Sequence, residues 1–373
     1  MENRTRRRVW LGVAALLFVL AAVLMFTGQG DEPAPEPKQV EFPRRMRGPE
    51  RERADKRRTY LMPTVADAGT GVAERSRPRD PVLAALPRGP GKTAVVIEAN
   101  ALRHSPIGEL LLDCLLRDGG KQLDEFRKLS GVDPLQDLDR LVVTDEGVML
   151  SGNFGNARFK ELLGERVSSD YGQGARVYEP GETTVTRPDG GTVRGRSDSA
   201  VGTWNDQLLV IGKSPDEVKA VIDRVEGRGP DLPPAIPENS TYGEIYGVLS
   251  VDQLARMLPP EQAELAQRIR DTAQNVELHV DATSDVAVVA EVTGPDGNKV
   301  TDLGKTLGGA LSMARLQAQA EGEKELAQLL DFARVRPDGT SFQLEMAVPL
   351  DVIKERLAFC REERQAVEGA TER

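Results

Sequence analysis

The sequence is poor in residues on which several functional classes depend. Its 373 residues include two cysteines and two histidines, too few ligands for a zinc finger or an iron–sulfur cluster. Aromatic residues make up 4% of the chain, whereas proteins that bind single-stranded nucleic acid use aromatic side chains as stacking surfaces. We therefore expect no metal, no cofactor and no nucleic-acid partner.

Charge is distributed unevenly along the chain. Residues 1–92 carry a net charge of +7, so the net −10 of the whole chain leaves −17 on residues 93–373. An acidic body repels phosphate backbones, which again argues against nucleic-acid binding. The length allows two modest domains of about 100 to 200 residues each.

One long apolar run dominates the N-terminal part. Val9 to Phe26 are 18 consecutive apolar residues behind the cluster Arg6-Arg7-Arg8, about the length that crosses a bilayer as a helix. The run is longer than the apolar region of a cleavable signal peptide, and no Ala-x-Ala cleavage site follows it. We expect residues 9–27 to be a transmembrane signal anchor in contact with the lipid bilayer, and residues 1–8 to be a cytoplasmic basic tail.

The positive cluster before the span favours an inner-membrane protein with a single span and its body in the periplasm. A second basic run counts against this orientation and keeps the inverted topology open. That run comprises Arg44, Arg45, Arg47, Arg51, Arg53, Lys56, Arg57 and Arg58.

The segment after the span resembles a linker. Residues 31–90 contain ten prolines and few periodic apolar residues, a composition typical of disorder. We expect residues 28–92 to be a disordered, proline-rich basic linker. Its basic run is either a solvated stretch or a contact site for an anionic surface, such as lipid headgroups or an anionic envelope polymer.

One motif in this segment points falsely to nucleotide binding. Gly91-Lys92-Thr93 matches the end of a phosphate-binding loop, but Leu86 stands where the first glycine belongs. Such a loop opens a helix, whereas the β-branched run at residues 94–99 predicts a strand. We expect no nucleotide site here.

The rest of the chain predicts an α+β fold with mainly antiparallel sheets. Residues 93–228 and 241–362 each give strand, helices, hairpin, helix and strand, so they form two α+β units that could be an internal duplication. The clearest local predictions are a turn at Asn205-Asp206 and a helix at Pro215–Val225, preceded by the capping residue Ser214. Residues 363–373 are expected to be a disordered tail.

Three segments carry a resemblance to known proteins. They are AVVIEANALRHSPIGELL, TWNDQLLVIGKSPDEVKAVID and DGTSFQLEMAVPLDVIKERL. Together they resemble poorly characterised signal-anchored envelope proteins of Gram-negative bacteria with tandem α+β units, over about residues 93–360. The resemblance implies no catalytic residue, cofactor or substrate.

Few side chains suggest chemistry. Glu277, His279 and Asp281 share one face of a predicted strand, and we expect that face to be solvated rather than to hold a metal. Cys114 and Cys360 lie on the apolar stripes of their helices, so they are buried thiols or, in a periplasmic body, a disulfide between the two units.

The favoured function is a membrane-anchored periplasmic binding or scaffolding protein of the cell envelope, without catalysis. An envelope protein or an anionic envelope polymer is the expected partner. Two alternatives remain: a membrane-tethered hydrolase built from carboxylates, and a cytoplasmic-facing membrane adaptor whose basic linker binds lipid.

Overall fold

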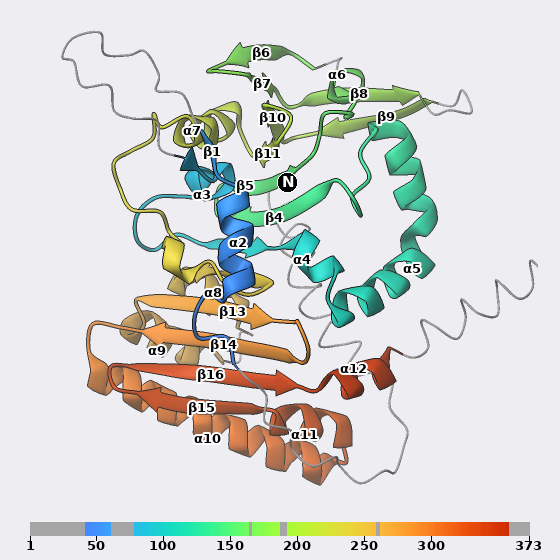
Figure 1. Cartoon of the computed structure of the whole chain (residues 1–373). Helices are drawn as coiled ribbons and strands as arrows, with labels where there is room; N and C mark the ends of the chain where they lie inside the picture. The colour runs from blue at the N-terminus through green and yellow to red at the C-terminus, as the bar shows by residue number, and fades with distance from the viewer. Residues whose placement is uncertain (1–41, 61–77, 164–165, 187–191, 259–261, 358–373) are drawn as a thin grey trace, which may run out of the picture.

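A computed structural model describes residues 42–60, 78–163, 166–186, 192–258 and 262–357. Their centre is one antiparallel sheet with the strand order β15-β16-β14-β13-β12-β3-β4-β5-β11-β10-β7-β6 (Figure 1). The expected α+β class and antiparallel pairing are therefore confirmed, and a single sheet runs through both units. The strands are β3 (Ala94–Ile97), β4 (Leu138–Thr144), β5 (Gly147–Gly152), β6 (Ser168–Tyr171), β7 (Ala175–Tyr178), β10 (Ala200–Trp204), β11 (Leu208–Gly212), β12 (Ile245–Leu249), β13 (Asn275–Asp281), β14 (Val286–Thr293), β15 (Ala333–Asp338) and β16 (Ser341–Val348).

The sheet repeats one strand order in its two halves. The first half runs β3-β4-β5-β11-β10 and the second runs β12-β13-β14-β16-β15. The halves meet where β3 and β12 pair in antiparallel fashion, with Val96 opposite Tyr246. The two halves thus share one strand order, while β7 and β6 extend the first half only. An internal duplication stays a prediction.

Each half of the sheet has its own set of helices. In the first half they are α3 (Pro81–Ala85), α4 (Ala99–Arg103), α5 (Pro106–Ser130), α6 (Phe159–Leu163) and α7 (Pro215–Val225), and in the second half α8 (Val251–Met257), α9 (Ala263–Thr272), α10 (Gly297–Glu321), α11 (Lys324–Asp331) and α12 (Leu350–Arg356). The hairpins β1 (Thr59–Tyr60) with β2 (Pro78–Arg79) and β8 (Gly181–Thr186) with β9 (Thr192–Ser197) lie outside the main sheet.

The two faces of the sheet are covered differently. Directly paired residues share a face, so Met149, Val96, Tyr246, His279 and Glu345 lie on the same face through their successive pairings. We call it the strap face. In the first half, α3 and α7 pack there over a large apolar core; in the second half, α9 and α10 cover the opposite face.

Local sequence explains several boundaries. Asn205 and Asp206 both have positive φ, as the predicted tight turn between β10 and β11 requires. Ser214 accepts a hydrogen bond from Glu217 N at 3.3 Å and caps α7. Both predictions are confirmed.

Helix α5 is one long, uninterrupted helix. It continues from Pro106 to Ser130, where Gly131 ends it in the left-handed conformation. Gly119 and Gly120 do not interrupt the helix, because glycine is a weak helix former and not an obligatory break.

The linker prediction is wrong for part of residues 28–92. A helix α2 (Gly48–Lys56) crosses the strap face near its middle (Figure 1), and α3 contributes Val82, Ala85 and Leu86 to the core. Prolines 49 and 81 stand at helix starts, where proline is favoured. Proline content was therefore a poor guide to disorder here.

The predicted anchor at residues 9–27 and the tail at 363–373 lie outside the described residues. Among the helices of the described ranges, none has the length and apolar character needed to span a bilayer. The anchor remains a prediction from the sequence.

Candidate functional site

Helix α2 forms one part of the candidate site. Its sequence GPERERADK offers Ala54 as its only aliphatic side chain beyond the proline. An apolar stripe is therefore not what holds it on the sheet, and its contacts must be charged. We call residues 42–58 the strap.

The strap is fixed by ion pairs to five carboxylates that lie far from it in the sequence. Arg47 lies 2.8 Å from Asp281 and Arg57 lies 2.6 Å from Glu98. Arg44 lies 3.5 Å from Glu345 and Arg53 lies 3.8 Å from Glu244, while Arg58 pairs with Glu238. Glu98, Glu244 and Glu345 are almost fully buried, so each pairing offsets the cost of burying a charge.

The basic run is thus neither a purely solvated linker nor wholly free for an anionic surface. Arg44, Arg47, Arg53, Arg57 and Arg58 contact the body, and Lys56 pairs with Glu52 within the helix. Arg45 and Arg51 are exposed. Contact with lipid headgroups or an envelope polymer remains a prediction for these outward side chains.

One of the three acidic residues of the strap also contacts the body. Glu50 is 6% exposed and its Oε1 accepts a hydrogen bond from Gly243 N at 2.8 Å. Nearby, Glu244 accepts from Ala282 N at 2.8 Å. Burial raises the pKa of Glu244, and the Asp281 carboxylate raises it further against the opposing effects of this hydrogen bond, Arg53 and Arg47.

The row Glu277, His279 and Asp281 is not the solvated surface expected from its alternation. His279 and Asp281 are buried, because Tyr242 stacks on the imidazole with 3.7 Å between ring centroids and Arg47 covers Asp281. The two ring nitrogens of His279 face Tyr242 O at 3.2 Å and Glu277 Oε1 at 3.0 Å. The hydrogen bond to His279 lowers the pKa of Glu277. Strand periodicity placed the three side chains on one face correctly, but it could not show what covers that face.

A second charged cluster lies beneath the strap. Arg140 donates to both oxygens of Asp80, at 2.7 and 2.8 Å, and both side chains are buried. Asp80 also caps α3 by accepting from Val82 N at 2.9 Å. Beside them Tyr246 donates to Glu98 at 3.0 Å. Burial, followed by the charge of Glu98, raises the pKa of Tyr246, so the phenol keeps the proton that it donates.

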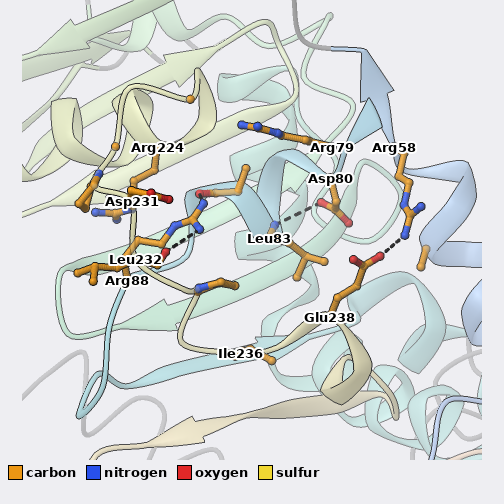
Figure 2. A pocket seen from close by; sticks show the side chains of 16 residues that line it. Arg58, Arg79, Asp80, Leu83, Arg88, Arg224, Asp231, Leu232, Ile236 and Glu238 are labelled. Carbon is orange, nitrogen blue, oxygen red and sulfur yellow. Dashed lines mark hydrogen bonds and ion pairs between the residues drawn. The ribbon is translucent and has the colours of Figure 1, made fainter. Parts of the chain in front are cut away.

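An open cavity borders this cluster. It lies between the strap, α3 and the loop after α7, and its volume is about 620 Å³ (Figure 2). Small-molecule sites are commonly clefts of roughly 300–1,000 Å³. Four arginines line it, Arg58, Arg79, Arg88 and Arg224, together with Asp80, Asp231 and Glu238.

Arg88 is the distinctive group of the cavity. Its guanidinium donates to two backbone oxygens, Leu232 O at 3.2 Å and Ala84 O at 3.4 Å. Among the described residues no carboxylate forms an ion pair with it, and its Nε is buried without a hydrogen-bond partner. Burial lowers the pKa of Arg88, and the charges of Arg224 and Arg79 lower it further, with Asp231 opposing them.

The other charges of the cavity wall are largely neutralised. Asp80 binds Arg140, Glu238 binds Arg58, and Arg224 binds Glu146 while donating from Nε to Ala85 O at 2.9 Å. Asp231 and Arg88 are therefore the groups most available to a ligand. Such a wall can recognise an anion, because guanidinium groups form paired hydrogen bonds with carboxylates and phosphates.

Cys114 lies in α5, beside the apolar cluster that α5 shares with α12. Cys114 is half-buried and disulfide-bonded. It packs against an apolar cluster in which α5 supplies Ile107 and Leu110 and α12 supplies Val352 and Ile353. Cys360 lies outside the described residues, so the pairing of Cys114 with Cys360 stays a prediction.

Two further sequence predictions concern nucleotide and metal binding. Thr93, in the false nucleotide motif, is buried and bonded to Ser250 and Asp145, directly before β3. Within the part of the chain that the structure describes, no three metal-ligating side chains gather into a site.

Sequence reasoning missed the cavity. Its wall combines α2 and α3, which were assigned to a linker, with residues 229–238, which lie between the two predicted units. The available signal was Asp80-Pro81, a capping residue followed by proline at the first helical position. That pattern marks a helix start inside the supposed linker.

Comparisons with known proteins leave the family open. No protein-family model and no curated protein matches the chain. A solved structure described as crystal form III of TP0453 aligns with a TM-score of 0.38 and 11% identity, over 74% of this chain and 96% of that chain. Crystal form IV of TP0453 gives a TM-score of 0.36 and 12% identity with the same coverage. A likeness at this level supports no argument about fold or function.

Proposed function

We propose that the protein is a membrane-anchored binding protein of the cell envelope, with its body in the periplasm and its ligand site in the arginine-lined cavity. The observation that carries the proposal is Arg88, a guanidinium held at the cavity wall by backbone oxygens alone among the described residues. Arg88 is partly buried, and burying a charge without a countercharge costs free energy. An anionic ligand would supply that countercharge.

The position of the strap supports the membrane-anchored part of the proposal. The strap closes one side of the cavity through Ala54 and Arg58. It also follows residues 28–41, which join it to the predicted anchor. At about 3.5 Å per residue these residues span at most about 50 Å. The cavity is thereby held within reach of the bilayer surface.

Binding without catalysis is favoured over the carboxylate hydrolase. Among the described carboxyl groups, Glu244 is the one whose pKa is raised, and it is buried beside the strap and bonded to Ala282 N. It does not line the cavity. Two of the three carboxylates that do line the cavity are already paired with arginines.

Photo-crosslinking in cells tests this proposal. A photoreactive residue replaces Leu232, which lines the cavity and is 50% exposed, and in a control it replaces Val167, which is 68% exposed and does not line the cavity. We expect a discrete adduct from position 232 and none from position 167. Equal labelling at both positions, or no adduct at position 232, would contradict a ligand site in the cavity.

A further inference from the structure

We infer that the cavity binds the phosphate group of an organic phosphate, with Arg88 as the principal ligand and Arg79 and Arg224 beside it. This inference rests on the proposed function and names the chemistry of its ligand. Figure 2 shows the three arginines on the side of the cavity formed by α3 and the loop after α7, with the pair Arg58 and Glu238 on the strap side.

The charges around Arg88 identify an anion as the missing partner. Burial lowers the pKa of Arg88, the charges of Arg224 and Arg79 lower it further, and Asp231 opposes them. Arg224 is paired with Glu146, whereas Arg88 forms no carboxylate ion pair among the described residues, so an anion bound beside Arg88 would supply the missing countercharge. The guanidinium of Arg224, with its side chain 7% exposed, is fixed by Glu146 and by Ala85 O, so it is pre-organised for such a ligand.

The number of cations favours phosphate over carboxylate. A phosphate monoester presents three acceptor oxygens and between one and two negative charges at neutral pH, which suits several guanidinium groups at once. A carboxylate presents two oxygens and one charge, for which a single arginine is sufficient. Arginine is also the residue used where phosphate is recognised through paired hydrogen bonds.

The rest of the cavity suits an organic portion. Leu83, Leu232 and Ile236 line it beside the arginines. Leu232 is half exposed although it is a large apolar residue. An organic group attached to the phosphate would cover that surface, and its burial adds to the binding free energy. The ligand class is therefore a phosphate ester, supplied either by a soluble metabolite or by a lipid headgroup.

Calorimetry with phenyl phosphate tests the inference on the full chain in nanodiscs of phosphatidylcholine. We expect Arg88→Met to weaken binding by about 10-fold to 100-fold, the range for a lost charged hydrogen bond. Asp231→Asn should strengthen binding by up to about fivefold, because it removes a nearby repulsive carboxylate. Arg256→Met, an exposed arginine on α8 outside the cavity, serves as the matched control and should leave binding unchanged.

Benzoate distinguishes the two anion classes. We expect it to bind at least about tenfold more weakly than phenyl phosphate, since it offers fewer acceptor oxygens. Equal binding of benzoate, or unchanged binding in both the Arg88 and the Asp231 variant, would overturn the inference. Because Asp231 lies in an exposed loop, its variant keeps the test decisive even if Arg88→Met fails to fold.

A second set of nanodiscs, with equal parts of phosphatidylglycerol and phosphatidylcholine, separates the two sources of phosphate. If headgroups occupy the cavity, they compete and weaken the apparent affinity for phenyl phosphate; if the ligand is soluble, the affinity is unchanged. Either result keeps the phosphate chemistry. If phenyl phosphate fails to bind while position 232 still forms its adduct in cells, the ligand chemistry is wrong and the proposed binding function survives.

Discussion

At the scale of single residues, the strap face is a place where charges are buried in pairs. Glu98, Glu244 and Glu345 are each at most 4% exposed. Glu98 and Glu244 pair with arginines of the strap, whereas Glu345 pairs with Arg44 of the strap and with Arg336 on β15 at 3.4 Å. Buried charges are tolerated only with such partners, so Glu98 and Glu244 depend on the strap.

The raised pKa of Glu244 predicts a specific pH dependence. A carboxyl whose pKa is higher in the folded state binds more protons there than when unfolded. Its contribution therefore favours folding most at or below the unfolded pKa of about 4.5 and weakens as the pH rises through the folded value.

Glu244→Gln imitates the protonated form and keeps an acceptor for Ala282 N. We expect the variant to gain thermal stability over the wild type as the pH increases from 4.5 to 8, measured by circular dichroism. A difference that stays constant with pH, or that shrinks, would show that Glu244 is not desolvated.

The pair of Asp80 and Arg140 predicts a strong coupling. Asp80→Ala leaves the buried Arg140 uncompensated and removes the cap of α3, so we expect a loss of about 3–5 kcal/mol in the free energy of unfolding in urea. The double variant Asp80→Ala with Arg140→Met should lose clearly less, because no buried charge remains. Additive losses would mean that the two side chains do not interact.

Sequence reasoning worked best at this scale where the cause is local. The turn at Asn205-Asp206 and the cap at Ser214 depend on neighbouring backbone atoms only. The partner of Arg57 is Glu98, 41 positions along the chain, and composition shows only that Arg57 is basic. The charged contacts of the candidate site could not be predicted for this reason.

At the scale of elements, α2 is a helix held by charge. Its boundaries follow from Pro49 in the first turn and from basic residues in the last turn, where the helix dipole favours them. These signals at its two ends predict a helix. The sequence does not predict the sheet face on which it docks.

Arg57 and Arg51 form a matched pair for testing this docking. Arg57→Ala removes the partner of a buried carboxylate, so we expect a loss of about 2–3 kcal/mol in the free energy of unfolding. Faster amide exchange across residues 48–56 should accompany that loss. Arg51 is exposed, and Arg51→Ala should change stability by less than about 0.5 kcal/mol. Equal exchange in the two variants would mean that the strap is not held by its inward arginines.

At the scale of the whole molecule, the pairing of β3 with β12 joins the two halves. The sequence predicted two units with similar element order but left their relation open, because pairing between distant strands is not visible in local patterns. Gly247 lies at this junction. A Cβ atom added there would stand 2.2 Å from Ala94 O and 2.7 Å from Val95 Cα.

Gly247→Ala therefore tests the continuous sheet. We expect a loss of about 1–3 kcal/mol in the free energy of unfolding, since backbone atoms of β3 must shift to admit the methyl group. Gly309→Ala is the control, because a Cβ there meets nothing within 4 Å and alanine favours the exposed helix α10 by about 0.5–1 kcal/mol. If both variants behave alike, the halves do not meet at Gly247.

The proposal that residues 9–27 hold a periplasmic binding body at the membrane is tested most directly with reporter fusions, which measure the orientation of the chain. Alkaline phosphatase is fused after Lys92 and, in a second fusion protein, after Arg373, with a fluorescent protein that matures only in the cytoplasm as the reciprocal reporter. The proposed orientation predicts active phosphatase and no fluorescence at both positions, because it keeps the cluster Arg6-Arg7-Arg8 in the cytoplasm. Inactive phosphatase with bright fluorescence at both positions would contradict it and place the arginine-lined cavity in the cytoplasm.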